Sequence, residues 1–147
     1  MKTKKDEKQP DKFRIAVLDD NLFYNKLLFN HIKNYFDEYG LINNCVFSVK
    51  SYVNTYDFIE NLSEKTDVVL LDFFLENGEN AIHVIEQIKQ KCPGCKVIVI
   101  SGVRNIDTYY KTYWLGAVDF VYKDKSAPLR ACRLIESIYA EKSAAMS

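Results

Sequence analysis

Five polar residues stand directly after short apolar runs of the chain, and their types suit chemistry at a metal ion. They are Asp19, Asp20, Asp72, Ser101 and Lys123. Three carboxylates brought together would repel one another and raise each other's pKa unless a cation neutralised them. Oxygen ligands of this kind suit Mg²⁺ or Mn²⁺, and the lack of His or Cys at these positions argues against zinc.

The same side chains meet the needs of phosphoryl transfer. That reaction requires neutralisation of the charge on the equatorial phosphoryl oxygens and a positioned nucleophile. A metal ion, the Lys123 ammonium and the Ser101 hydroxyl would provide the first. Asp72 follows the middle apolar run and is the natural nucleophile.

The elements that must position these residues alternate along the chain. Apolar runs predict strands over 13–18, 45–49, 68–71, 97–100 and 117–122, and helical spacing predicts helices over 22–36, 56–62, 82–88 and 106–115, with a fifth from about 126. Strict alternation predicts a doubly wound α/β sheet, because parallel strands need crossover connections. Since the carboxyl ends of parallel strands share one edge, the five polar residues should meet there.

With these residues in this order, the chain resembles the receiver domains of two-component response regulators from about Phe13 to Lys142. Its acidic pair, central Asp, Ser and Lys each stand at the end of the matching element. The resemblance implies a flavodoxin-like fold, like that of the chemotaxis regulators, with five parallel strands in the order 2-1-3-4-5 and five helices.

The resemblance also assigns roles to residues. Asp19, Asp20, Asp72 and the backbone carbonyl of Phe74 would hold Mg²⁺ or Mn²⁺, and Asp72 would be the phosphoacceptor. Ser101 and Lys123 would contact the phosphoryl group, with Gly102 leaving room for it. Phe120 would reorient together with Ser101 as the switch.

The implied partners are a sensor histidine kinase or phosphotransfer protein as phosphodonor, and an unidentified downstream protein. The downstream protein would bind the surface formed by the fourth helix, fifth strand and fifth helix, and a homodimer is a further option. The resemblance implies autocatalytic phosphorylation and dephosphorylation rather than multiple-turnover catalysis.

Several residues depart from the family pattern. Asp124 follows Lys123 where many receivers carry a cis proline, and the segment after Asp72 lacks a common proline. Phe74 and Val103 occupy positions that tune acyl-phosphate hydrolysis, and neither can orient a water molecule, so we expect slow dephosphorylation.

The predicted fourth helix carries four aromatic residues, Tyr109, Tyr110, Tyr113 and Trp114. Such residues are enriched in binding hot spots, so a partner or dimer interface is one interpretation. The other is that about half of them pack on the sheet, as aromatic residues at helical spacing usually do.

Two alternatives belong to other classes. A haloacid-dehalogenase-like Mg²⁺-dependent phosphatase also uses a strand-end Asp, but it needs a second acid two residues later, where this chain has Asn21. A receiver used only for protein interaction would have lost one of the site residues. The chain could also be a receiver fragment of a larger regulator whose output domain is missing.

Composition is that of one globular domain, with 147 residues, 48% of them hydrophobic and 27% charged, and zero formal net charge. Residues 1–12 hold five Lys and three acids without an apolar run, and we expect a disordered basic tail. Residues 13–142 would form the receiver and 143–147 a disordered end. No apolar run could span a membrane, so we expect a soluble cytoplasmic protein without direct contact to membrane or nucleic acid.

The four cysteines are expected to be reduced. Cys45 and Cys132 lie in apolar patterns and are expected in the core. Cys92 and Cys95 form a C-x-x-C around Pro93 and Gly94, but no second ligand pair is present for zinc. A turn that leads into the following strand is the favoured interpretation over a metal or redox role.

Overall fold

The computed structural model describes residues 11–75 and 81–146, which form one five-stranded sheet with five helices. All strand pairs are parallel, and the order is β2-β1-β3-β4-β5, which confirms the predicted doubly wound topology. The strands are β1 (Asp11–Leu18), β2 (Cys45–Tyr52), β3 (Val68–Asp72), β4 (Lys96–Ser101) and β5 (Ala117–Tyr122). The helices are α1 (Leu22–Asn43), α2 (Thr55–Asn61), α3 (Ala81–Lys91), α4 (Ile106–Trp114) and α5 (Ala127–Met146).

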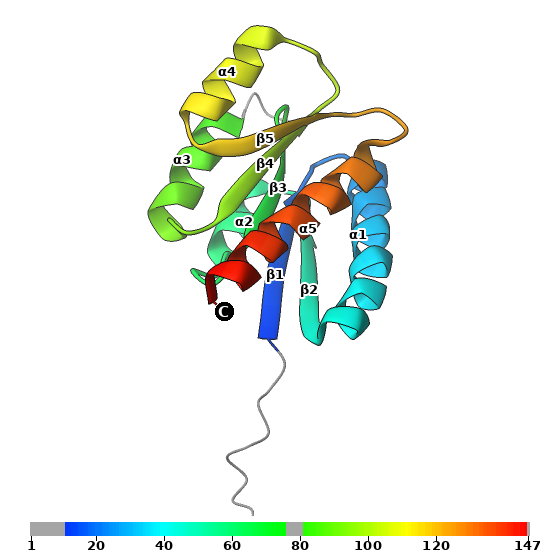
Figure 1. The fold of residues 1–147 in the computed structure, drawn as a ribbon. Coiled ribbons are helices and arrows are strands. Elements are labelled where there is room, and N and C mark those ends of the chain that lie inside the picture. The colour runs from blue at the N-terminus through cyan, green and yellow to red at the C-terminus, as the bar shows by residue number, and fades with distance from the viewer. Residues whose placement is uncertain (1–10, 76–80, 147) are drawn as a thin grey trace, which may run out of the picture.

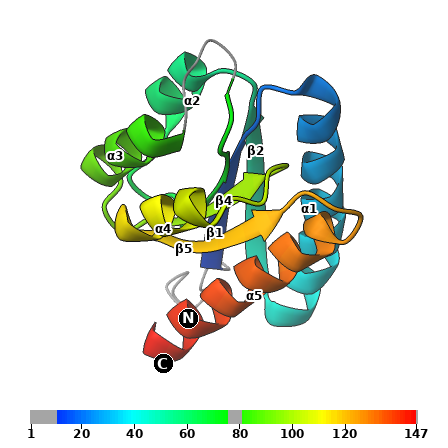
Figure 2. The same ribbon diagram turned by 90° about the horizontal axis from the view of Figure 1, so that it is seen from above.

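The helices cover both faces of the sheet, with α1 and α5 on one side and α2, α3 and α4 on the other (Figures 1 and 2). Alternate residues of a strand therefore enter different cores. Ile15 and Val17 of β1 pack with α1 and α5, whereas Ala16 and Leu18 pack with α2 and α3. Burial on both sides explains why β1, β3 and β4 are nearly continuous apolar runs.

Local signals in the sequence fix several element ends. Asn21 caps α1, because its side chain accepts a hydrogen bond from the backbone N–H of Tyr24 at 2.9 Å. Gly116 follows α4 with a φ of 101°, a conformation that glycine adopts without strain. Gly40 lies so close to Cys45 that a Cβ there would overlap the Cys45 carbonyl oxygen.

Two elements extend beyond the limits predicted for the receiver, residues 13 and 142. Strand β1 begins at Asp11, so the last two residues of the predicted disordered tail pair with Cys45 and Val46 of β2. Helix α5 continues to Met146, because residues 143–146 (Ser-Ala-Ala-Met) include two alanines and a methionine, which are strong helix formers. Residues 1–10 and 147 lie outside the described part of the chain.

Helix α4 has an inverted distribution of polar and apolar side chains. Its buried residue is Thr112, whose hydroxyl donates to the carbonyl oxygen of Tyr109 at 2.9 Å. Tyr110, Tyr113 and Trp114 are exposed, Trp114 to 83% of its surface. Of the four aromatic residues of α4, only Tyr109 contacts an aromatic ring of the sheet. That ring belongs to Phe120, and the two ring centroids are 5.9 Å apart. The expectation that about half of these rings pack on the sheet was therefore too high.

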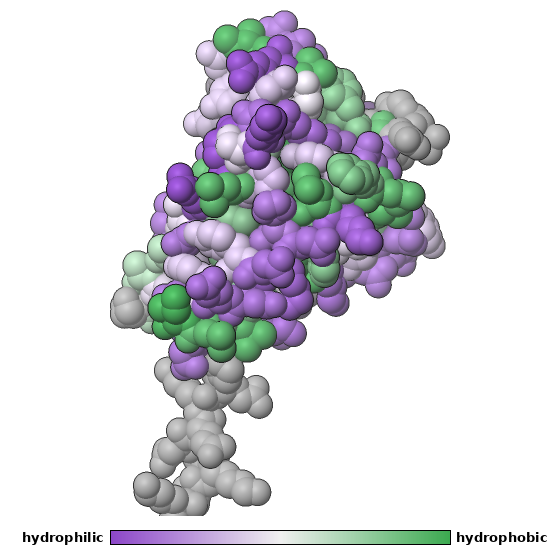
Figure 3. Space-filling view, turned by 90° about the vertical axis from the view of Figure 1, so that its right-hand side faces the viewer, coloured by the Kyte–Doolittle hydropathy of each residue, from purple (hydrophilic) through white to green (hydrophobic). Residues whose placement is uncertain are grey.

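The opposite side of the molecule, over α1 and α5, is mostly hydrophilic with separate apolar patches (Figure 3). The large exposed apolar residues of α1 lie near its two ends and are Leu22, Phe23, Leu41 and Ile42. Within residues 11–75 and 81–146, no helix is both long enough and apolar enough to cross a membrane.

Candidate functional site

The three predicted carboxylates meet at the carboxyl edge of the sheet. Asp19 follows β1 and Asp72 ends β3, and these strands are neighbours. One carboxylate oxygen from each of Asp19, Asp20 and Asp72 lies within 4.8 Å of the other two. Asp19 and Asp72 are buried, at 1% and 7% exposure. This separation lets all three oxygens contact one small cation.

Lys123 reaches the same cluster from the end of β5. Its Nζ lies 3.0 Å from Oδ2 of Asp19 and 3.4 Å from Oδ1 of Asp72. The backbone N–H of Lys123 donates to the carbonyl oxygen of Ser101 at 2.8 Å, which ties the ends of β4 and β5 together. The ammonium therefore bridges two carboxylates that belong to different strands.

One lysine does not fully compensate the buried negative charge. Burial raises the pKa of Asp72 to about 6, and the charges of Asp19 and Asp20 add to this, while Lys123 acts against it. A divalent cation would relieve the remaining repulsion. The possible ligands are all oxygen atoms, and Asp20 is partly exposed to solvent, which fits Mg²⁺ or Mn²⁺.

Ser101 is fully buried at the end of β4, and its Oγ accepts a hydrogen bond from the backbone N–H of Val103 at 3.1 Å. A Cβ built at Gly102 would meet no atom within 4 Å, so open space adjoins this residue. Phe120 is half-buried on β5, with its ring against Tyr109 of α4. Phe74 is exposed beside the acids, and the metal role of its carbonyl stays a prediction.

Three residues that shape the site were not predicted from the sequence. Asn25 is buried, and its Nδ2 donates to the carbonyl oxygens of Asp19 at 2.9 Å and Tyr52 at 2.7 Å. Arg130 donates to the carbonyl oxygen of Tyr122 and to the Asp124 carboxylate, both at 2.8 Å, on either side of Lys123. No cis peptide occurs in the described residues. The Arg130 side chain binds the loop that carries Lys123 on both sides of this lysine.

Tyr24 is the third of these residues, and its ring lies against the Lys123 ammonium, with Nζ 4.3 Å from the ring centroid. Tyr24 lies four residues after Asp20, in the first turn of α1. That spacing is a signal that could have identified it.

The cysteine pair lies far from the acids along the chain and is buried. Cys92 and Cys95 are both 0% exposed, and the backbone N–H of Cys95 donates to the Cys92 carbonyl oxygen at 3.1 Å across the turn. Burial raises the pKa of Cys95, which disfavours the reactive thiolate. The turn interpretation accounts for both residues.

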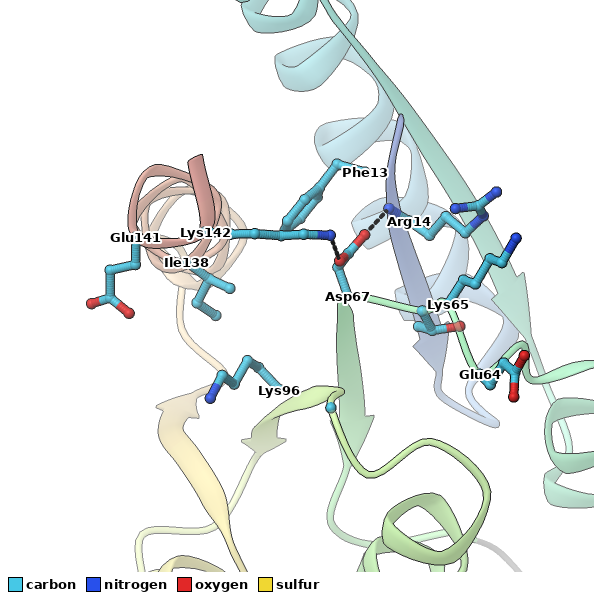
Figure 4. Close-up of a pocket in the computed structure, with 11 residues that line it drawn as sticks. Phe13, Arg14, Glu64, Lys65, Asp67, Lys96, Ile138, Glu141 and Lys142 are labelled. Atoms are coloured by element: carbon cyan, nitrogen blue, oxygen red, sulfur yellow. Dashed lines mark hydrogen bonds and ion pairs between the residues drawn. The ribbon is translucent and has the colours of Figure 1, made fainter. Parts of the chain in front are cut away.

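A cavity of about 630 Å³ lies at the opposite, amino-terminal edge of the sheet (Figure 4). There Lys142 of α5 pairs with Asp67, whose other oxygen accepts a hydrogen bond from the backbone N–H of Arg14 at 2.8 Å. None of the five strand-end residues lines this cavity. The contacts join α5 to the sheet and are separate from the acidic cluster.

Comparison with known proteins places the chain in a family. The model of the response regulator receiver domain matches residues 15–133, so the chain belongs to that family. A putative NtrX-like response regulator of Rickettsia felis is 34% identical over 96 residues, which are 60% of this chain and 20% of that protein. The chain thus spans about a fifth of the length of such curated relatives.

Solved structures agree on the fold. The BeF3-activated receiver domain of DrrB, a Thermotoga maritima protein, superimposes with a TM-score of 0.71 at 21% identity and covers 88% of this chain and 98% of that one. The beryllofluoride-activated NtrC4 receiver domain dimer gives a TM-score of 0.70 at 25% identity, with 87% and 97% covered. The family match disfavours the dehalogenase-like alternative, and Asn21 serves instead as the cap of α1.

Proposed function

We propose that this receiver domain takes a phosphoryl group from a phosphohistidine onto Asp72 in a reaction that requires Mg²⁺ or Mn²⁺. The observation that carries the proposal is the convergence of Asp19, Asp20, Asp72 and Lys123 at one sheet edge. A carboxylate oxygen of Asp72 lies within 4.8 Å of one from each of the other two acids, and Asp72 is paired with an ammonium. This is the arrangement that an attacking carboxylate needs when negative charge builds up on a phosphoryl group.

In the proposed step, a carboxylate oxygen of Asp72 attacks phosphorus while the bond from phosphorus to the histidine nitrogen breaks. The bonding electron pair stays on the imidazole, which takes up a proton, and an acyl phosphate forms on Asp72. Lys123 moves its ion pair from the carboxylates to a phosphoryl oxygen, and the Ser101 hydroxyl donates to another. Asp19, Asp20, Asp72 and the backbone carbonyl of Phe74 would hold the divalent ion, which would supply positive charge to offset that of the phosphoryl group.

The switch follows from the charge that Asp72 gains. The acyl phosphate carries roughly two negative charges where the carboxylate carried one, and its phosphoryl oxygens recruit Ser101 and Lys123. Ser101 precedes the segment that leads to α4, and Phe120 touches Tyr109 of α4, so movement at the site can reach this helix. The surface of α4, β5 and α5 would then bind a downstream protein or a second copy.

The partners of this chain are proposed as well, since the matched region is only about a fifth of the length of the curated relative. A histidine kinase or phosphotransfer protein would supply the phosphoryl group, and a cytoplasmic location would suit such a donor. The solved NtrC4 receiver is a beryllofluoride-activated dimer, which supports testing the same assembly here.

The test is exposure to acetyl phosphate or phosphoramidate with Mg²⁺, followed by intact mass measurement. We expect one added phosphoryl group on the wild type and none on Asp72→Asn. Asp37→Asn is the matched control, since Asp37 is an exposed acid that pairs with Lys33 on α1. Absence of the added mass from the wild type, or its persistence in Asp72→Asn, would overturn the proposal.

A further inference from the structure

Lys123 has a third neighbour besides its two carboxylates, and that neighbour is an aromatic face. The Lys123 Nζ lies 4.3 Å from the centroid of the Tyr24 ring. An ammonium within about 6 Å of a ring face is attracted by the negative potential of that face. The lysine side chain is only 18% exposed, so little water screens the contact. The Lys123 ammonium thus contacts the Tyr24 ring in addition to the two carboxylates.

Tyr24 is itself held in place by the start of α1. Its backbone N–H donates to the Asn21 cap, and its ring packs against the core between α1 and α5. The backbone bond fixes the position of the residue, and the ring cannot withdraw from Lys123 without leaving its packing against this core. Asp19 is tied to the same turn, because its Oδ1 accepts a hydrogen bond from the backbone N–H of Asn21 at 2.9 Å. Ring and carboxylate therefore form one cradle for the ammonium next to the start of α1.

The hydroxyl of Tyr24 takes no part in this cradle. Its oxygen is buried and has no hydrogen-bond partner among the described residues. Burial, with the charges of Asp19, Asp124 and Asp72, raises the pKa of Tyr24 to about 12, so the phenol is neutral. A neutral ring without a bonded hydroxyl acts on the lysine through its face alone. Phenylalanine should therefore replace it, whereas an aliphatic residue should not.

We propose that Tyr24 is a positioning residue that holds the Lys123 ammonium over Asp19 and Asp72, ready for the incoming phosphoryl group. This inference rests on the proposed phosphoryl transfer at Asp72. Without the ring, the Lys123 side chain has more conformational freedom. Ordering it in the transition state then costs more entropy, which slows the reaction. The Asp72 nucleophile and the acidic pair are untouched by the change.

The test compares Tyr24→Leu with Tyr24→Phe and with Tyr39→Leu as matched control. Tyr39 is another half-buried tyrosine of α1 in the same core, and its ring contacts Phe36, Phe47 and Tyr139. We expect Tyr24→Leu to slow phosphorylation by phosphoramidate roughly three- to tenfold, the range that cation–π contacts allow. Tyr24→Phe should restore the wild-type rate, and Tyr39→Leu should lower stability without slowing the reaction.

A second readout does not depend on phosphorylation. The ring current of Tyr24 should shift the Cε proton resonances of Lys123 upfield in the resting protein. The shift should persist in Tyr24→Phe and vanish in Tyr24→Leu. A wild-type rate in folded Tyr24→Leu, or an unshifted Lys123 resonance in the wild type, would overturn the inference. If the wild type accepts no phosphoryl group, the proposed function fails, while the resonance still decides whether the ring holds the lysine.

Discussion

At the scale of single residues, Asp72 carries an electrostatic penalty that should be visible in stability. Its pKa is about 6 in the folded protein against 3.8 for a free side chain. Between these values the folded state binds the proton more tightly than the unfolded state, so stability falls as pH rises toward 6. Above that pH the full penalty is present.

Asp72→Asn should therefore stabilise the protein without metal by about 1 to 2 kcal/mol at pH 7.5, and the gain should fade below about pH 4. Urea unfolding across this pH range measures it. Added Mg²⁺ should narrow the difference, because it binds and stabilises the wild-type carboxylates. A destabilised Asn variant at pH 7.5 would show that Asp72 is held by favourable interactions instead.

Two further residues bear on the lifetime of the acyl phosphate. Phe74 and Val103 are apolar and about half exposed, at 51% and 46%, and lie two residues beyond Asp72 and Ser101. Neither side chain can orient water for attack on phosphorus. Phe74→Asn introduces an amide that can, and we expect it to shorten the lifetime roughly three- to tenfold.

The decay of the phosphorylated mass over time, after removal of the donor, measures this lifetime. Phe74→Leu is the control, since it changes the size of the side chain but offers no hydrogen bond. A wild-type lifetime of seconds, or equal lifetimes for the Asn and Leu variants, would contradict the expectation of slow hydrolysis.

At the scale of elements, α4 places its apolar side chains outward. Because Trp114 is 83% exposed, Trp114→Ala should change the free energy of unfolding by less than about 0.5 kcal/mol. Ile88→Ala removes a fully buried side chain of α3 and should cost about 2 to 5 kcal/mol. Urea unfolding of both variants makes the comparison.

Trp114→Ala also tests the role of the exposed aromatic residues of α4. If these residues bind a second copy of the protein, sedimentation velocity of the beryllofluoride-treated wild type should show a dimer that Trp114→Ala weakens. A large loss of stability in Trp114→Ala would instead assign the tryptophan to the fold.

The elements also show how far the sequence determines the structure. Strands β3 and β4 are buried on both sides, so their apolar runs predicted them to within one residue at each end. Strand β2 lies at the sheet edge, where Ser48, Lys50 and Ser51 face partly toward solvent, and its predicted end at Val49 was three residues short. The orientation of α4 was left open between two interpretations, because spacing alone does not say which side of a helix faces the sheet.

For the site, strand-end positions were enough to bring Asp19, Asp20, Asp72, Ser101 and Lys123 together, because parallel topology gathers them. Tyr24, Asn25 and Arg130 were missed for a different reason. Their roles depend on the direction of side chains in the first turns of α1 and α5, which no pattern of apolar residues encodes.

At the scale of the whole molecule, all four cysteines are buried in the reduced state. Their thiols should react with an aromatic disulfide reagent only as the protein opens. We expect slow modification of the folded protein, rapid modification in denaturant, and no retained zinc after dialysis. One or two thiols that react at once in the folded protein would revive a redox role for Cys92 and Cys95.

The most direct test of phosphoryl transfer locates the modification on the chain. The protein is treated with phosphoramidate and Mg²⁺, the acyl phosphate is reduced with borohydride, and the resulting homoserine is mapped by peptide mass spectrometry. Phosphorylation at Asp72 predicts homoserine at that residue alone, and its loss when Mg²⁺ is withheld. Homoserine at another acid, or none at any position, would contradict the assignment of Asp72 as the phosphoacceptor.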